Sequence, residues 1–140
     1  MLTIIIPGHM HGKGRPKFAR RGKFTVAYTD EKTVSAENWI KTCAVDQAGN
    51  PCLEGPLIVT MDVSLTIPDS WSKKKKVAAL SGELRPTGKP DVDNYFKTAG
   101  DALNEIVWRD DSQIVEARVT KRYAEIPQTI ITVEQIGVAP

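Results

Sequence analysis

Aspartates gather in one region of the second half of the chain. Asp91 and Asp93 are separated by a single residue, and the pair Asp110-Asp111 follows further along. Mg²⁺ is usually held by one or two carboxylates together with water and phosphate oxygens, and beside a phosphodiester it assists hydrolysis. Lys97 stands one helical turn after Asp93, which suits a cation next to the scissile phosphate. These residues predict metal-assisted phosphodiester chemistry.

The same residues also have a purely structural explanation. An aspartate at a helix N-terminus stabilises the helix by roughly 0.3–1 kcal/mol, so one of Asp91 and Asp93 needs no metal. Asp93 with Lys97 could be a plain surface pair, and Asp110-Asp111 a turn. An EF-hand is excluded, because the stretch from Asp91 lacks the required glycine and glutamate. The residue types alone leave both explanations open.

Basic residues gather elsewhere. The net charge of +2 conceals two runs without acids. The first run contains Lys13, Arg15, Lys17, Arg20, Arg21 and Lys23, and the second contains Lys73, Lys74, Lys75 and Lys76. Segregated cations suit a polyanion such as DNA, bound through its phosphates, and the alternative is that the basic loops are simply solvated. Phe18, inside the first run, either wedges between bases or anchors its loop on the core.

The elements that must position these groups follow from periodicity and breakers. The 140 residues suit one domain, spanning residues 1–140. Strands are predicted at residues 2–6, 57–67, 113–123 and 128–136, and helices at residues 29–48 and 91–108. A brief strand near residues 23–28 and a helical turn near residues 73–80 are also expected. The order β-α-β-α-β-β indicates an α+β fold with a mixed β-sheet and two main helices.

Two apolar faces carry the helix predictions. The first helix places Val34, Trp39, Ile40, Cys43 and Ala44 on one side. The second helix places Tyr95, Ala99, Ala102, Leu103 and Ile106 at helical spacing.

This second helix raises a distance problem. A helix of about 16 residues is roughly 24 Å long, which separates Asp91 from Asp111. Either the helix is shorter and the flanking residues fold inward, or the carboxylates meet across a subunit boundary. The sequence does not choose between these arrangements.

Other classes are excluded by composition. No apolar stretch reaches the roughly 18 residues of a membrane span, and the N-terminus lacks the features of a signal peptide. Cys43 and Cys52 are too few for a disulfide framework and lack the neighbours of a zinc site. We therefore expect a reduced, cytoplasmic protein without a membrane partner.

Three motifs follow one another in the second half of the chain. They are Lys89-Pro90-Asp91-Val92-Asp93-Asn94-Tyr95-Phe96-Lys97, then Asp101-Ala102-Leu103, then Trp108-Arg109-Asp110-Asp111-Ser112-Gln113-Ile114. This series resembles the RusA family of Holliday junction resolvases, marked by D-[hydrophobic]-D-N-x-x-K, D-A-L and D-D-x-Q-[hydrophobic]. The segments around Gly12-Lys13-Gly14 and Trp71-Ser72-Lys73 resemble phage-type members. The likeness covers most of the chain, residues 3–136.

The resemblance implies a homodimeric, Mg²⁺-dependent crossover junction endodeoxyribonuclease, with Mn²⁺ as a possible substitute. Such an enzyme nicks four-way DNA symmetrically in recombination and repair, and a phage or prophage source fits. The metal ligands implied are Asp91, Asp93 and Asp111, with Lys97 as the catalytic lysine. Asp110 and Asp101 receive less defined roles. Pro90 stands where a basic residue can precede the first aspartate, so Lys89 is expected to contact phosphate instead.

Two other functions stay open at this stage. One is a nuclease that acts mainly on other branched DNA, such as forks or flaps. The other is a non-catalytic nucleic-acid-binding module whose carboxylates only cap a helix.

Overall fold

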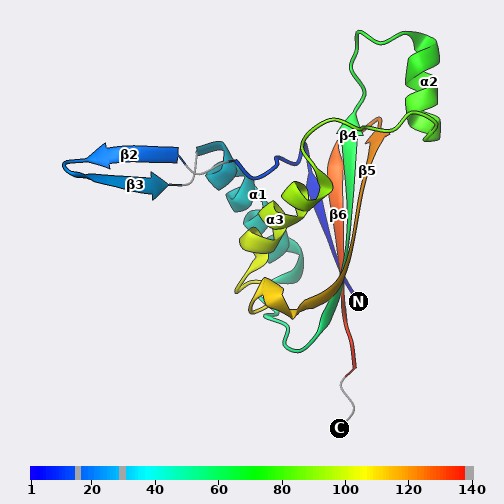
Figure 1. Ribbon diagram of the computed structural model, residues 1–140. Coiled ribbons are helices and arrows are strands. Elements are labelled where there is room, and N and C mark those ends of the chain that lie inside the picture. The colour runs from blue at the N-terminus through cyan, green and yellow to red at the C-terminus, as the bar shows by residue number, and fades with distance from the viewer. Residues whose placement is uncertain (15–16, 29–30, 138–140) are drawn as a thin grey trace.

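A four-stranded mixed sheet forms the centre of the molecule. The computed structural model describes residues 1–14, 17–28 and 31–137 (Figure 1). The sheet has the order β1-β6-β4-β5, formed by β1 (Leu2–Pro7), β4 (Leu57–Thr66), β5 (Ile114–Ala124) and β6 (Gln128–Gln135). Strand β6 runs antiparallel to β1 and β4, whereas β4 and β5 are parallel. The predicted α+β class with a mixed sheet is confirmed.

Two helices cover one face of this sheet. Helix α1 (Glu31–Ala48) and helix α3 (Val92–Leu103) lie on the same side (Figure 1). The face of β4 beneath them is buried through Leu57, Val59, Met61 and Val63, each at most 1% exposed. The alternate residues of β4 are mostly half-buried. The alternation therefore produces one dry face, and the core lies between this face and the two helices.

Helix α1 buries a narrower stripe than predicted. Ile40, Cys43 and Ala44 are buried as expected. Val34 and Trp39 are 41% and 45% exposed, so their placement on the buried side was wrong. The Trp39 indole N–H donates to the Pro7 carbonyl at 2.8 Å, which fixes the ring at the edge of β1 rather than in the core.

Helix α3 ends earlier than its apolar pattern predicts. The helix stops at Leu103, and Asn104 leaves helical geometry with ψ 135°. Glu105 takes a φ of 67°, and its N–H donates to the Trp108 carbonyl at 2.7 Å. The predicted continuation to Trp108 was therefore wrong. The chain instead reverses direction, with Ile106 packed against the core from the turn.

Trp108 holds this reversal. Its side chain is 1% exposed, and its indole N–H donates to the Asn104 Oδ1 atom at 2.9 Å. Burial of so large a ring, with its polar atom satisfied, contributes several kcal/mol to folding.

Two further elements project from the body. Strands β2 (Lys17–Arg21) and β3 (Phe24–Tyr28) form a hairpin that extends away from the sheet, and α2 (Lys73–Ser81) lies at a different corner (Figure 1). The sequence predicted only a brief strand and a helical turn in these places. Ser72 caps α2 by accepting from the Lys75 N–H, and Gly82 ends it with a φ of 84°. The described residues thus hold three α-helices, and the part of the first basic run from Lys17 onward lies on a different protrusion from the second run.

None of these helices, within the described ranges, has the length and apolarity needed to cross a bilayer.

The Trp108→Ala variant tests the origin of the reversal. Removing this buried ring should lower the free energy of unfolding by about 3–5 kcal/mol, because it leaves a cavity in the core. Trp39→Ala is the matched control, since the Trp39 ring is 45% exposed and should cost much less. Urea unfolding followed by circular dichroism measures both values. Equal costs would show that the Trp108 side chain does not hold the turn.

Candidate functional site

The first two aspartates stand at the start of α3. Asp91 is the N-cap residue, yet its side chain accepts no capping hydrogen bond. Asp93 lies in the first turn, and both side chains are exposed. Within residues 1–14, 17–28 and 31–137 neither carboxylate forms an ion pair. The capping explanation therefore does not account for the Asp91 carboxylate, and Asp93 is not paired with Lys97.

The chain reversal brings Asp111 back to α3. Asp111 opens the short 3-10 turn η1 (Asp111–Gln113), which directly precedes β5. A Cβ atom added at Gly100 would lie 3.3 Å from Asp111 Oδ2 and 3.7 Å from Asp111 Cβ. Gly100 therefore leaves the space that the Asp111 side chain occupies. The helix is thus shorter than predicted and the residues after it fold back, but the described residues contain no group of three His, Cys, Asp or Glu side chains that could hold a metal.

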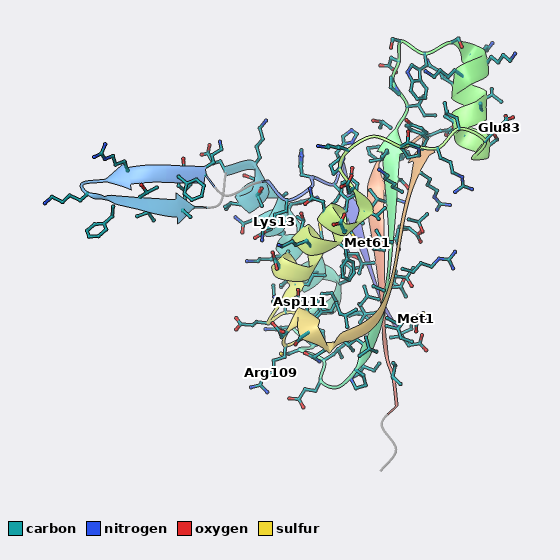
Figure 2. All side chains as sticks on the ribbon, in the orientation of Figure 1. Met1, Lys13, Met61, Glu83, Arg109 and Asp111 are labelled. Atoms are coloured by element: carbon teal, nitrogen blue, oxygen red, sulfur yellow. The ribbon has the colours of Figure 1, made fainter. Side chains whose placement is uncertain are left out.

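Asp93, Lys97 and Gly100 occupy one face of α3. Their spacing of i, i+4 and i+7 stacks them along a single stripe. Asp111 lies against the Gly100 end of this stripe, beside α3 (Figure 2). Asp93 and Gly100 are roughly 10 Å apart along the helix axis. We call the stripe of Asp93, Lys97, Gly100 and the apposed Asp111 the acidic face.

The two adjacent aspartates have different roles. Asp110 caps η1, since its Oδ2 accepts from the Ser112 N–H at 3.0 Å. Hydrogen bonds from the Ser112 side chain and backbone hold the pKa of Asp110 below its usual range. The Asp111 carboxylate accepts no hydrogen bond among the described residues and lies exposed. Asp110 is thus used by the turn, and Asp111 is available for a ligand.

The start of the first basic run is packed tightly on α3. The Lys13 N–H donates to Asn94 Oδ1 at 2.9 Å, and its ammonium pairs with the Asp101 carboxylate. A Cβ added at Gly12 would lie only 2.7 Å from Pro90 Cβ, so only glycine fits there. Lys13, predicted to bind DNA, has partners within its own chain (Figure 2). Asp101, whose role was open, is one of those partners.

Lys121 also positions the start of α3. Its ammonium donates to the Gly88 and Pro90 carbonyls at 2.6 and 3.1 Å, which ties β5 to the segment before Asp91. Sequence reasoning missed this residue. A lysine within a strand carries no signal of its partner, because the parallel pairing of β5 with β4 cannot be read from the pattern.

Several predicted DNA-binding cations are exposed on the protrusions. On the hairpin they are Lys17, Arg20 and Lys23, and on α2 they are Lys73 and Lys74, while the exposed Lys89 stands just before α3. Lys76 is half-buried, and the Lys75 ammonium lies 4.0 Å from the centre of the Trp71 ring. Arg15 and the side chain of Arg21 lie outside the described residues. Phe18 is 68% exposed, so the expectation that it anchors its loop on the core was wrong.

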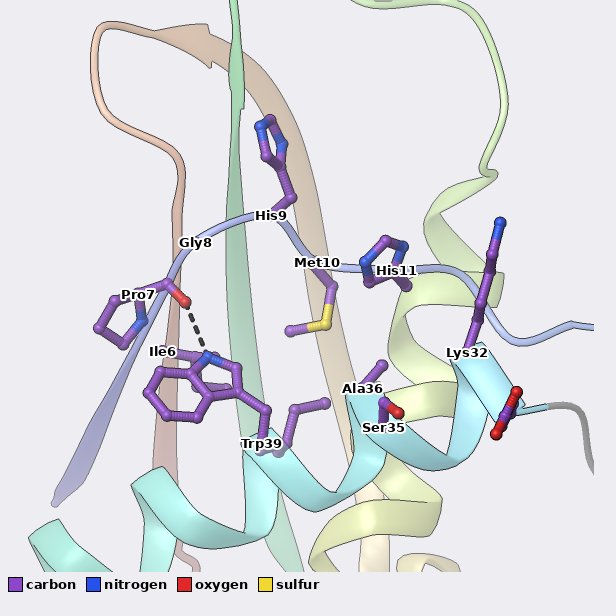
Figure 3. A pocket seen from close by; sticks show the side chains of 12 residues that line it. Ile6, Pro7, Gly8, His9, Met10, His11, Lys32, Ser35, Ala36 and Trp39 are labelled. Carbon is purple, nitrogen blue, oxygen red and sulfur yellow. Dashed lines mark hydrogen bonds between the residues drawn. The ribbon is translucent and has the colours of Figure 1, made fainter.

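A cavity lies near the base of the hairpin. It has a volume of about 470 Å³ and is bounded by the segment from Ile6 to His11 and by the first half of α1, including Trp39 (Figure 3). None of the four acidic-face residues lines it. The side chains of Asp93, Lys97 and Asp111 are exposed, so a large substrate can reach the acidic face.

The open acidic face, with cations on two protrusions, suits hydrolysis of phosphodiesters in a nucleic acid, so fold and site point to the class of nucleases. Comparison with known proteins specifies this class. The family model for endodeoxyribonuclease RusA matches residues 7–134. The chain is also 34% identical over 138 residues to the uncharacterized protein YqaN of Bacillus subtilis (strain 168), with 97% of each chain covered. The chain belongs to the RusA endodeoxyribonuclease family, and the resemblance seen in the sequence is confirmed.

The Gly100→Ala variant tests the packing of Asp111 on α3. The added methyl group should displace the Asp111 side chain by a few tenths of an ångström and lower DNA cleavage at least about tenfold. Stability should hardly fall, because alanine is favoured over glycine inside a helix by roughly 0.5–1 kcal/mol. Gly88→Ala is the control, since a Cβ there meets nothing within 4 Å. Cleavage rates and melting temperatures of both variants decide the matter, and full activity of Gly100→Ala would contradict this packing.

Proposed function

We propose that this chain is a Mg²⁺-dependent, structure-specific endonuclease that resolves four-way DNA junctions by symmetric phosphodiester hydrolysis in recombination and repair. One observation carries the proposal: the chain reversal sets Asp111 on the stripe of α3 that holds Asp93 and Lys97. Membership of the RusA family supports the junction as substrate.

The donor chemistry of the acidic face fits Mg²⁺. Its carboxylates are exposed hard oxygen donors without ion-pair partners among the described residues. Mg²⁺ commonly binds one or two carboxylates and completes its octahedron with water and phosphate. In the described part of one chain, no three His, Cys, Asp or Glu side chains are grouped closely enough to hold a metal. Asp91, Asp93 and Asp111 would therefore share the ion with substrate phosphate or with a second copy of the chain.

Each residue of the face then has a task. Asp93 and Asp111 would hold the ion, and Asp91 would contribute from the helix N-cap. When bound, Mg²⁺ or Mn²⁺ supplies the positive charge that favours attack on a phosphodiester. Lys97 places its ammonium beside the same phosphate and offsets charge that develops on the leaving oxygen. Because the face is open, a duplex arm can reach it directly.

The protrusions account for the preference for branched DNA. The hairpin and α2 carry their exposed cations at separate corners of the molecule (Figures 1 and 2). Cations so far apart can neutralise phosphates on different arms of one junction, and Lys89 adds a contact next to Asp91. A homodimer with two-fold symmetry would match the symmetry of a four-way junction and deliver two cuts. The cytoplasmic location stays a prediction.

Neutralising one carboxylate separates catalysis from binding. Asp93→Asn and Asp111→Asn should each lower junction cleavage by roughly 10²–10³-fold or more, because an electrostatic contribution at the reacting phosphate is lost. Junction affinity should stay constant or increase, since a negative charge facing DNA disappears. Cleavage of a labelled four-way junction, with Mg²⁺ and with EDTA, gives the rates, and gel shifts in EDTA give the affinity.

The exposed Asp69 supplies the matched control for this experiment. Asp69→Asn removes one charge far from α3 in sequence and should cleave like the parent protein. Cleavage by Asp93→Asn at the parent rate would contradict the proposal. Faster cutting of a flap than of the junction would favour the nuclease for other branched DNA.

The hairpin cations should govern the salt dependence of binding. Lys17→Gln combined with Lys23→Gln should weaken junction binding equally for all sequences. The double variant should also make the slope of the logarithm of the association constant against the logarithm of the salt concentration shallower by about 1–2. Each lost phosphate contact removes roughly 0.9 from the magnitude of this slope. Lys41→Gln, in α1 and outside both basic runs, is the control. Filter binding between 50 and 200 mM salt, roughly the range over which such contacts are lost, measures the slopes. Identical slopes would remove the hairpin from the DNA interface.

A further inference from the structure

The Gln113 side chain uses every hydrogen-bonding position that it has. Its Oε1 accepts from the Arg109 and Asp110 N–H groups, both at 2.9 Å. Its Nε2 donates to the Leu53 and Gly55 carbonyls at 2.9 and 3.0 Å. A glutamine amide offers two acceptor lone pairs and two N–H donors, so this set is complete. We call these four bonds the Gln113 clamp.

The clamp joins two segments that are far apart in the sequence. On one side is the turn of residues 109–113, which carries Asp111. On the other side is the loop of residues 53–55, itself fixed because the Leu53 N–H donates to the Val107 carbonyl at 2.7 Å. The turn is therefore hydrogen-bonded to a second segment besides α3.

Apolar packing and ion pairing within η1 and its neighbours contribute little to the position of this turn. None of the residues of η1 is buried, so apolar packing contributes little to its position. The nearby pair of Arg109 and Glu54 is separated by 3.8 Å, and both side chains are more than three-quarters exposed, so its stabilisation is small. The clamp therefore adds four hydrogen bonds to the buried Trp108 ring and the Asp110 cap in holding the Asp111 backbone near Gly100.

We propose that Gln113 is a positioning residue. Its clamp holds the Asp111 carboxylate at the Gly100 end of α3, where this carboxylate can serve as a ligand of a divalent cation. This inference rests on the proposed function, because it takes Asp111 as a metal-holding group. Metal ligands must be held within about 0.5 Å of the productive geometry, and a loosely attached turn does not provide that. Glutamine suits the position since its amide bonds donors and acceptors at once.

Gln113→Met tests the clamp with nearly constant side-chain size. Gln47→Met is the matched control. The Gln47 amide both accepts from the Ile5 N–H and donates to the Ile5 carbonyl, and Ile5 lies in β1, at the opposite edge of the sheet from β5. Gln135→Met is a second control, which removes a single bond to Glu54 in the same loop. Gln113→Asn keeps the amide on a shorter stem and serves as the milder variant if Gln113→Met does not fold.

Amide hydrogen exchange provides the first measurement. Gln113→Met, or Gln113→Asn in its place, should increase exchange at the Arg109 and Asp110 N–H groups at least about tenfold, because their acceptor is lost. Both controls should leave these two amides protected. Unchanged protection in the Gln113 variant would overturn the clamp itself, whatever the protein does to DNA.

Metal binding provides the second measurement. The Gln113 variant should raise the Mn²⁺ dissociation constant, measured by electron paramagnetic resonance, at least about tenfold. The Mg²⁺ concentration for half-maximal junction cleavage should rise in parallel. Junction affinity in EDTA should change less than about twofold, and neither control should alter these values.

The double variant with Asp111→Asn decides whether Gln113 acts through Asp111. In that background the Gln113 substitution should weaken Mn²⁺ binding no further, because interacting residues are not additive. A further loss of the same size as in the parent protein would overturn the positioning role.

The two proposals fail in different ways. A parent protein that neither binds Mn²⁺ nor cleaves the junction overturns the proposed function and this inference with it. A parent protein that does both, while the Gln113 variant performs equally at the same metal concentration, overturns only the inference.

Discussion

The reversal of the chain after Leu103 is the constraint on which the arrangement of the acidic face depends. Helix α3 presents Asp93 and Lys97 by its own periodicity, but Asp111 reaches the same stripe only because the chain turns back. The turn is stabilised by the buried Trp108 ring and by the absence of a side chain at Gly100. Core packing and the space at Gly100, rather than nearness in the sequence, thus bring Asp111 next to the helix that carries Asp93 and Lys97.

Hydrogen bonds and an ion pair also fix the start of α3. Lys13 bonds Asn94 and Asp101, and Lys121 bonds the carbonyls of Gly88 and Pro90. These contacts connect the base of the cationic hairpin and the edge strand β5 to the turn that carries Asp91.

Periodicity predicted much of this fold, and local pattern predicted less of the site. The pattern of residues 57–67 and the stripe of Tyr95, Ala99 and Leu103 correctly predicted a strand and a helix. The end of α3 was wrong, because Ile106 continues the apolar spacing although it packs from a turn. Exposure of Trp39 followed from its bond to Pro7, a tertiary contact that no helical pattern encodes.

The charged residues of the acidic face could be named from motifs, whereas the hydrogen bonds that hold them in place could not. Asp111 was chosen over Asp110 by resemblance, and the hydrogen bonds of the η1 turn now give a physical reason for the choice. Gln113 belongs to the D-D-x-Q motif, but the motif does not say what its side chain binds, and Lys121 carried no signal at all, because both act on backbone carbonyls of remote segments. Backbone carbonyls are present at every position, so the sequence contains no mark of which one a side chain will reach.

Charge placement explains why the acidic face and the cations lie apart. Exposed carboxylates on α3 repel a phosphate chain, and the described ion pairs neutralise neither Asp93 nor Asp111. Cations on the hairpin and α2 attract the same polyanion from a distance without filling the space beside the carboxylates. DNA is thus attracted to the protein as a whole and repelled at one face. Under the proposed function, a divalent cation on this face would offset the repulsion, so that substrate binding and metal binding would reinforce each other.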